Sequence, residues 1–361
     1  MKRSPRILVA NLALIVLIAF LCFVLHPSEP TYQGRRLREW LINAAMTVVY
    51  PNANADAVKA IRHIGSNAVP TLLSYAAAKD SPVKKSIMKW NDRLPAFLSL
   101  PVSPQIEQEM LAQVGFNMLG PGGKSAVPGL VRLLQDDDES VRVTAAVCLG
   151  FIGPGAELAV PELIKEFERE KSATTNGHFE AAFALGQIGP AAQAAIPSLK
   201  AGLTNNSTDC QRISQAALIN IHALSISPLL EQLKDTTNNQ WVTASMVVLQ
   251  CGTNALPAVP LFISALDCTN HSIQSRSLSA LGWLHQEPKA CVPAVMPFLT
   301  AKDDYLRQNA INVLRCFGKE SKPAVPALLR CLSDPNYSVR EVATNALREI
   351  DPEAAAKAGI K

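Results

Sequence analysis

A proline that follows an apolar residue recurs along the chain, and its regular spacing limits what the sequence can fold into. The prolines of this series are Pro70, Pro128, Pro161, Pro197, Pro228, Pro260, Pro293 and Pro326, and all but Pro228, which follows Ser227, come after Val or Ile. Their successive spacings are 58, 33, 36, 31, 32, 33 and 33 residues. Such a period is typical of repeat architectures, in which one supersecondary unit is stacked many times.

Two helices are predicted in each unit. The proline opens the first, because its missing N–H has no intrahelical partner there and its φ is already helical. Apolar residues two and six positions later, such as Leu130 and Leu134, share one face of that helix. The second helix starts after Asp or Asn and ends at a glycine, as in the segment from Asp303 to Gly318. Alanines recur in its middle, at Ala145, Ala181, Ala310 and Ala343.

The second helix and the start of the next unit read D-x-x-x-V-R-x-x-A-x-x-x-L-x-x-I/F-G followed by A-V-P-x-L. This pattern resembles the short HEAT repeat, the type also found in phycobilisome lyase subunits. The resemblance covers residues 51–352. It implies an all-α protein: an α-solenoid of about eight or nine stacked antiparallel helix pairs, each burying its apolar face on its neighbours.

The array is predicted to be irregular near residues 80–104, where several prolines mark a loop between two atypical repeats. Basic residues at this loop form a candidate binding patch: Lys84, Lys85, Lys89 and Arg93. The alternative is a solvated helix face whose charge is balanced by Asp80 and Asp92.

Residues 7–25 form an apolar run with one strongly polar side chain. As a helix this run would be about 28 Å long, which matches the hydrocarbon core of a bilayer. Basic residues precede the run and no small-x-small cleavage site follows it, so residues 1–26 are predicted to be a basic leader and an uncleaved transmembrane anchor. A cleaved signal peptide and a buried core helix are the alternatives.

Residues 27–50 are predicted to be a linker and a capping helix, and residues 353–361 a tail. Within segment 31–45, one helical stripe would cover the apolar end of the first repeat. The stripe consists of Leu37, Trp40, Leu41 and Ala44.

The string Y-x-G-[KR]-x-L-x-x-W-L, from Tyr32 to Leu41, is similar to a segment that follows the anchor of bacterial membrane-bound HEAT proteins. The resemblance implies a single-pass protein of the bacterial inner membrane with periplasmic repeats. Basic residues on both sides of the apolar run compete under the positive-inside rule. They are Lys2, Arg3 and Arg6 before it and Arg35, Arg36 and Arg38 after it. A cytoplasmic repeat domain and a soluble periplasmic protein with a cleaved signal therefore stay open as alternatives.

No catalytic, metal or cofactor site is predicted. None of the six histidines is followed by Glu, whereas the HEAT-repeat enzyme deoxyhypusine hydroxylase binds iron through His-Glu pairs. The eight cysteines form no C-x-x-C pair, and no P-loop, G-x-S-x-G or H-E-x-x-H motif occurs. The net charge of +4 includes three basic residues of the leader, so the repeats are near neutral and no nucleic-acid partner is expected. No small-molecule ligand is indicated.

The sequence favours a non-enzymatic, membrane-tethered scaffold that binds protein partners on an extended solenoid surface. Candidate surface residues follow the glycine in the last turn of the second helix or take equivalent positions: Phe151, Gln187, Gln250, Trp283 and Cys316. Core packing is the alternative for Phe151 and Trp283. The alternative function is an enzyme or enzyme subunit of the phycobilisome-lyase-like HEAT class.

An arginine recurs near the start of the second helix, at Arg142, Arg307 and Arg340. Each is predicted to pair with Asp or Glu of a neighbouring turn, because a repeated interface offers such partners at a fixed distance. A phosphate-binding ladder is the alternative.

Overall fold

The computed structural model describes residues 29–48, 55–79, 105–172 and 179–360. Within these ranges the chain is almost entirely helical, which confirms the all-α prediction. The predicted anchor at residues 7–25 and the candidate basic patch lie outside the described residues. That patch consists of Lys84, Lys85, Lys89 and Arg93.

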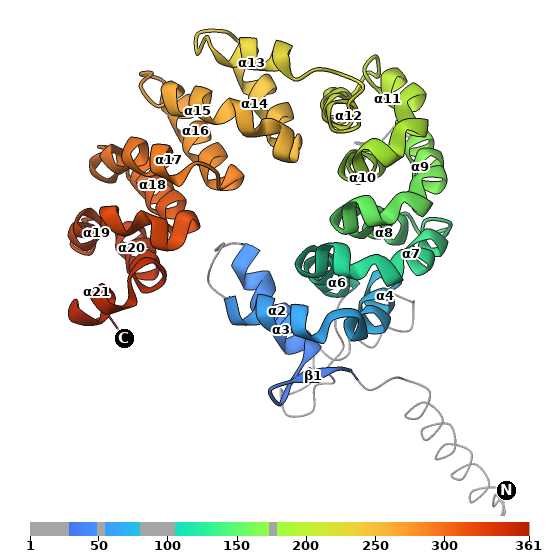
Figure 1. The fold of residues 1–361 in the computed structure, drawn as a ribbon, viewed down its shortest axis with the longest axis horizontal. Coiled ribbons are helices and arrows are strands. Elements are labelled where there is room, and N and C mark those ends of the chain that lie inside the picture. The colour runs from blue at the N-terminus through green and yellow to red at the C-terminus, as the bar shows by residue number, and fades with distance from the viewer. Residues whose placement is uncertain (1–28, 49–54, 80–104, 173–178, 361) are drawn as a thin grey trace, which may run out of the picture.

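The helices are stacked in antiparallel pairs, and the stack curves through most of a circle (Figure 1). One helix of each pair faces the inside of this curve. These inner helices are α6 (Gln105–Leu119), α8 (Glu139–Ile152), α10 (Glu180–Ile188), α12 (Thr208–Asn220), α14 (Trp241–Gln250), α16 (His271–Leu284), α18 (Asp304–Phe317) and α20 (Tyr337–Ile350). The outer helices are α4 (Val69–Ala76), α7 (Val127–Leu133), α9 (Val160–Ser172), α11 (Ile196–Gly202), α13 (Ser227–Leu233), α15 (Val259–Ala265), α17 (Pro288–Val295) and α19 (Val325–Cys331). The predicted α-solenoid is therefore confirmed.

Short 3-10 segments lead into most outer helices. They are η1 (Gly65–Ala68), η2 (Gly120–Ala126), η3 (Gly153–Ala159), η4 (Gly189–Ala195), η5 (Gly252–Ala258) and η7 (Gly318–Ala324). Each begins at a glycine with positive φ, for example 69° at Gly153 and 72° at Gly189, a conformation that stops the preceding helix. The proline of the repeat then stands in the first turn of the outer helix, as predicted.

One proline of the series departs from this rule. Pro293 lies inside α17, which begins at Pro288, and a 3-10 segment, η6 (Met296–Thr300), follows the helix. The prediction that Pro293 opens its helix is wrong, because Pro288 supplies a first-turn residue with helical φ earlier in the chain.

Most inner helices start at a capping side chain that accepts hydrogen bonds from backbone N–H groups of the first turn. The caps are Asp138, Ser207, Asn270, Asp303 and Asn336. A cap of this kind stabilises a helix by about 1 kcal/mol. The start of an inner helix is thus determined locally by its own sequence.

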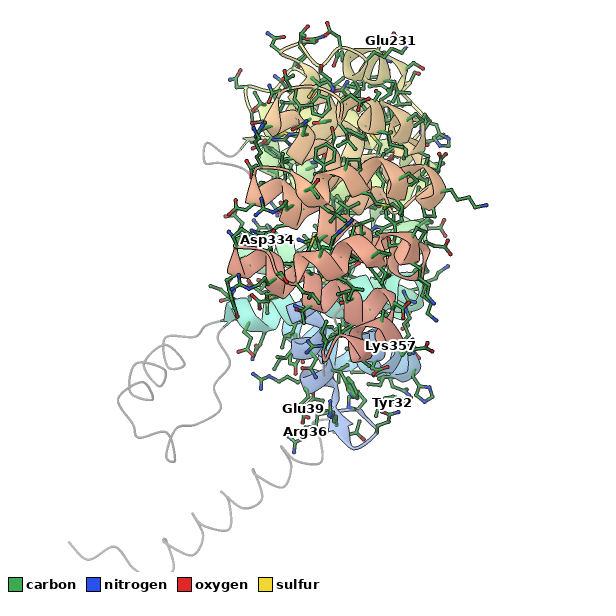
Figure 2. All side chains as sticks on the ribbon, turned by 90° about the vertical axis from the view of Figure 1, so that its left-hand side faces the viewer. Tyr32, Arg36, Glu39, Glu231, Asp334 and Lys357 are labelled. Atoms are coloured by element: carbon green, nitrogen blue, oxygen red, sulfur yellow. The ribbon has the colours of Figure 1, made fainter. Side chains whose placement is uncertain are left out.

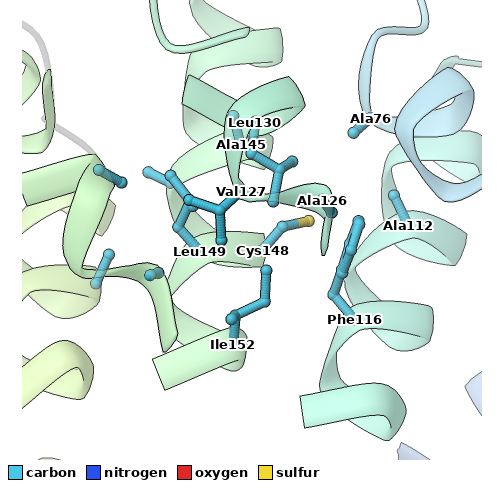
Figure 3. Close-up of a cluster of buried hydrophobic side chains, with 14 of the residues drawn as sticks. Ala76, Ala112, Phe116, Ala126, Val127, Leu130, Ala145, Cys148, Leu149 and Ile152 are labelled. Carbon is cyan, nitrogen blue, oxygen red and sulfur yellow. The ribbon is translucent and has the colours of Figure 1, made fainter. Parts of the chain in front are cut away.

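The core lies between the inner and outer helices, and Figure 3 shows a representative part of it. Side chains of α7 and α8 meet there with a phenyl ring from α6, and each is at most 2% exposed. They are Phe116, Val127, Leu130, Cys148, Leu149 and Ile152. Full burial of one such side chain stabilises the fold by about 1.5–3 kcal/mol. Every helix pair shares this layer with its neighbours, so none can bury its apolar surface alone.

The N-terminal end of the stack is covered by a hairpin and a helix. β1 (Thr31–Tyr32) pairs with β2 (Arg35–Arg36) in antiparallel register across a turn at Gln33 and Gly34. α2 (Leu37–Val48) follows and packs on α3 (Ala55–Ile64) and α6. Figure 2 shows the hairpin, labelled at Tyr32 and Arg36, at the end of the molecule.

The helix expected over segment 31–45 therefore begins later, at Leu37. Gln33 and Gly34 have φ of 49° and 76°, which a helix cannot accommodate, and the Glu29 carboxylate accepts the N–H of Arg38 at the start of α2. The predicted apolar stripe is buried, with Leu37, Trp40, Leu41 and Ala44 each at most 5% exposed.

Among the described residues, one helical stretch is long and apolar enough to cross a membrane, Glu139–Ser172. It combines α8, η3 and α9, and 61% of its most apolar window is buried. Because the chain turns at Gly153 and the stretch packs between neighbouring repeats, it is part of the solenoid core.

A substitution at Gly186 tests how closely the inner helices α10 and α12 pack. A Cβ at this residue of α10 would lie 3.0 Å from the Cα of Ala217 in α12, so Gly186→Val should lower the free energy of unfolding by about 1–3 kcal/mol. Chemical denaturation followed by far-UV circular dichroism measures the change. Gly122→Val is the control, because nothing lies within 4 Å of a Cβ there. Equal stability of the two variants would contradict the packing described.

Candidate functional site

The five residues proposed as a binding surface occupy the last turns of inner helices, but in unlike environments. Phe151 is half-buried and contacts Phe183 of the next inner helix edge to face, with ring centroids 6.2 Å apart. Trp283 is 71% exposed. Cys316 is half-buried, and burial raises the pKa of its thiol. Packing against the next helix thus covers part of the Phe151 side chain, whereas most of the Trp283 side chain is exposed to solvent.

Gln187 and Gln250 come together. Both line a narrow hollow of about 10 Å³ between inner helices, with Phe183 and Asn220 also in its wall. Asn220 joins two repeats, because its amide donates to the carbonyl oxygen of Gln250 at 3.2 Å and its oxygen accepts from Asn254 at 3.1 Å. Gln187, Asn220 and Gln250 therefore line one hollow at the last turns of three consecutive inner helices, and we call these three residues the polar ladder.

Asn220 was not among the predicted surface residues. The five predicted surface residues each stand ten positions before the proline of the next outer helix, as Gln187 does before Pro197. Counting back ten positions from Pro228 gives Leu218, which is buried, and not Asn220. The reason is a shorter connection, in which a turn at His222 with φ of 66° stands where other repeats have a 3-10 segment. A 31-residue proline spacing was the available signal.

Large aromatic side chains are exposed on three consecutive inner helices. Trp283 of α16 is 71% exposed, Tyr305 of α18 59% and Tyr337 of α20 68%. The Arg340 guanidinium lies over the Tyr337 ring at 5.6 Å from its centroid. Tyr305 and Tyr337 were not predicted, since nothing in their sequence context distinguished them from other first-turn residues.

Tyr305 is part of an open groove of about 510 Å³ on α14, α16 and α18. Its lining residues are Leu249, His271, Ser272, Ser275, Arg276, Ser279, Asp303, Tyr305 and Leu306. A second hollow of about 300 Å³ shares His271, Asp303 and Leu306 with the groove and continues toward Phe298 and Lys302.

Both carboxylate oxygens of Asp303 have partners within the protein. It accepts the backbone N–H groups of Tyr305 and Leu306, which together hold the pKa of its carboxyl below the usual range. Its other oxygen lies 3.4 Å from Nδ1 of His271. The carboxylate is therefore ionised, caps the start of α18 and lies within reach of the His271 ring.

The recurring arginines stabilise the stack. Arg142 donates to Glu166 of α9 at 2.8 Å and to the carbonyl oxygen of Asp136 at 2.9 Å. Arg307 pairs with Asp334 at 2.8 Å, and Arg340 donates to the carbonyl oxygen of the same residue. In Figure 2, Asp334 is labelled at one side of the stacked helices. Pairing with acidic neighbours is confirmed for Arg142 and Arg307, while Arg340 bonds to backbone.

The described cysteines are free thiols, and most are buried. Burial raises the pKa of Cys251 to about 12 and that of Cys291 to about 11, so neither supplies a thiolate at neutral pH. In the described part of the chain, no group of three or more His, Cys, Asp or Glu side chains is arranged to hold a metal ion.

Comparison with known families identifies the repeats. Residues 292–358 match HEAT repeats, residues 126–156 match a HEAT repeat, and residues 179–205 match a PBS lyase HEAT-like repeat. No curated protein matches the chain. The chain therefore contains HEAT repeats, and one of them is of the PBS lyase HEAT-like type.

Two solved structures are similar to this chain at low identity. One is an engineered protein, 18% identical, which covers 90% of this chain and 92% of its own with a TM-score of 0.34. The other is the complex of CpcE and CpcF of phycocyanin lyase from Nostoc sp. PCC7120, 23% identical, covering 64% of this chain and 92% of its own with a TM-score of 0.35. These scores are low, and the assignment rests on the repeats themselves.

Buried carboxylates occur on the outer helix α9. Glu166 is satisfied by Arg142 and Arg169. Glu170, 7% exposed, accepts the N–H of Ala181 at 3.3 Å, and one of its oxygens has no hydrogen-bond partner. Burial, with the nearby charges of Glu180 and Glu166, raises the pKa of Glu170 to about 9. At neutral pH the folded protein therefore holds this carboxyl protonated.

The Glu170 carboxyl should make the solenoid less stable as pH rises. Its pKa is about 9 folded against 4.5 ordinarily, so between these values the unfolded chain binds fewer protons and the free energy of unfolding falls with pH. Glu170→Gln should flatten this dependence, at about 1.4 kcal/mol for each pKa unit removed. Chemical denaturation at both ends of the window tests it. Exposed Glu157, changed to Gln, is the control and should keep the wild-type slope.

Proposed function

We propose that this protein is a non-enzymatic scaffold that binds a protein partner on the concave side of its HEAT repeats. The observation that supports it most is the exposure of Trp283, Tyr305 and Tyr337 on three consecutive inner helices. Tryptophan, tyrosine and arginine are the residue types that contribute most binding energy in protein interfaces. An exposed indole serves no packing role in the stack, so its exposure on an inner helix favours contact with another molecule.

The polar ladder extends this surface. Gln187, Asn220 and Gln250 stand between the half-buried ring of Phe151 and the exposed ring of Trp283 along the series of inner helices. Amide side chains of this kind can exchange hydrogen bonds with a partner's backbone. The candidate surface thus combines aromatic anchors with adaptable polar groups, and Cys316 continues it toward the C-terminal end.

We further propose that residues 7–25 tether the repeats to a membrane as a single-pass anchor, with the repeats on the periplasmic side of a bacterial inner membrane. Glu29 already caps α2, so only residues 26–28 separate the apolar run from the folded domain. The hairpin with exposed Arg35 and Arg36 would then lie next to the lipid headgroups. The cleaved, soluble form and the cytoplasmic orientation are the competing arrangements.

A lyase-like role is the second candidate, and the match of residues 179–205 to a PBS lyase HEAT-like repeat favours it. An absorption spectrum and metal analysis of the purified protein separate the two. A stoichiometric chromophore or iron would overturn the scaffold proposal.

Replacing Trp283 should weaken partner binding. Because a buried interface tryptophan is worth about 2 kcal/mol or more, Trp283→Ala should lower the affinity for the partner by at least about tenfold. A photo-activated cross-linking residue at Ser279, which is exposed one turn before Trp283 on α16, identifies the partner in intact cells, and titration of the purified pair gives the affinity. The same cross-linker at Lys200, which is exposed on outer helix α11, is the control. Identical adducts from both positions would contradict a concave binding surface.

Membrane attachment is tested by a reporter. Alkaline phosphatase fused after Lys361 should be active and should stay in carbonate-washed membranes, because the reporter folds only when exported. Activity in the soluble periplasm would mean cleavage of the segment. An inactive fusion would mean that Arg35, Arg36 and Arg38 direct the repeats to the cytoplasm.

A further inference from the structure

The open groove on α14, α16 and α18 is lined by an arginine, Arg276, that has no acidic partner among the described residues. Arg276 is half-buried in the groove wall, and it makes neither a hydrogen bond nor an ion pair with any of the described residues. The one carboxylate in the lining, Asp303, is committed to His271 and to the first turn of α18. The recurring arginines Arg142, Arg307 and Arg340 pair with acidic or backbone oxygens, and Gln274 takes their position in α16. Arg276 stands two residues further along this helix and makes no such contact with any described residue.

Three serine side chains line the groove together with this guanidinium. Ser272, Ser275 and Ser279 of α16 line the same groove as Arg276. The Ser279 hydroxyl donates to the carbonyl oxygen of Ser275 at 3.0 Å, and the Ser275 hydroxyl accepts from Asn309 of α18 at 2.9 Å. These side chains are small, and the groove of about 510 Å³ that they line with Arg276 has room for a carboxylate, which can accept two parallel hydrogen bonds from a guanidinium.

An apolar anchor lies on the same ridge of the helix. Ser272, Arg276, Ser279 and Trp283 are spaced four, three and four residues apart and so share one face of α16. Arg276 and Trp283 are seven residues apart, which places them about 10 Å from each other along the helix axis. Leu249 and Tyr305 supply apolar walls from the neighbouring inner helices.

We propose that this groove binds a peptide segment of the partner protein that carries an Asp or Glu side chain and a bulky apolar residue close to it. Arg276 takes the carboxylate, and Trp283 takes the apolar side chain. The inference rests on the proposed scaffold function and specifies its partner. Because Arg276 and Trp283 stand about 10 Å apart along α16, the acidic and apolar residues of an extended peptide that reaches both are about three positions apart.

Charge supports a peptide over nucleic acid as the occupant. Arg276 is the one lysine or arginine in the groove lining, and Asp303 stands in the same wall. A nucleic-acid backbone would place several phosphates there with a single permanent cation to neutralise them. One carboxylate matches the single open guanidinium.

A random peptide display library, selected on the full-length protein in mild detergent, tests the proposal. The selected peptides should be enriched in Asp or Glu near an aromatic or aliphatic residue. A labelled peptide of this kind should bind about tenfold more weakly when its acidic residue is changed to the amide, and it should lose the same factor against Arg276→Gln. Binding should also shift the tryptophan emission through Trp283. Trp40 and Trp241 are buried, and the fourth tryptophan is removed by Trp90→Phe for this measurement.

Arg330→Gln is the matched control, because Arg330 is an exposed arginine of the outer helix α19. It should leave peptide affinity unchanged, and circular dichroism should show both variants folded. Peptides that bind Arg276→Gln as tightly as the wild type overturn this inference while the scaffold proposal stands. A library that yields no binding peptide also overturns it, and failure of cross-linking at position 279 then removes the scaffold proposal as well.

Discussion

The packing of each helix pair on the next is the constraint on which the whole structure depends. No pair buries its apolar face alone, so the core lies between inner and outer helices. Among the described residues it consists of two clusters of buried side chains that meet at α12, and α2 covers its N-terminal end. Small residues at the crossings, such as Gly186 against Ala217, determine how closely the inner helices approach. That closeness produces the curve in Figure 1 and therefore the concave side on which the proposed function depends.

Polar groups in this stack have two different roles. Arg142 and Arg307 bridge repeats to buried or nearly buried carboxylates, and they support the architecture. Arg276 of α16 lines the groove and has no such bridge to any described residue. An arginine is thus structural at the recurring position near the start of an inner helix and open to a ligand at a position two residues further along.

Much of the architecture could be predicted from the sequence. Proline spacing, capping residues and glycines act within one or two turns of chain, so they determine helix starts and ends locally, as Asp303 and Gly318 do for α18. Predictions were wrong where two local signals competed. Pro288 displaced Pro293 as the first-turn residue of α17, and the turn at Gln33 and Gly34 postponed α2 to Leu37.

The sequence by itself determined a helical repeat protein with an apolar N-terminal run, because period and apolar spacing are properties of the chain. Only the tertiary structure decided which side chains of the last turns are exposed. Phe151 and Trp283 occupy the same repeat position, yet Phe183 covers part of one and nothing comparable covers the other. Exposure depends on the residue that the next repeat presents across the interface, and that residue lies about thirty positions away in the chain.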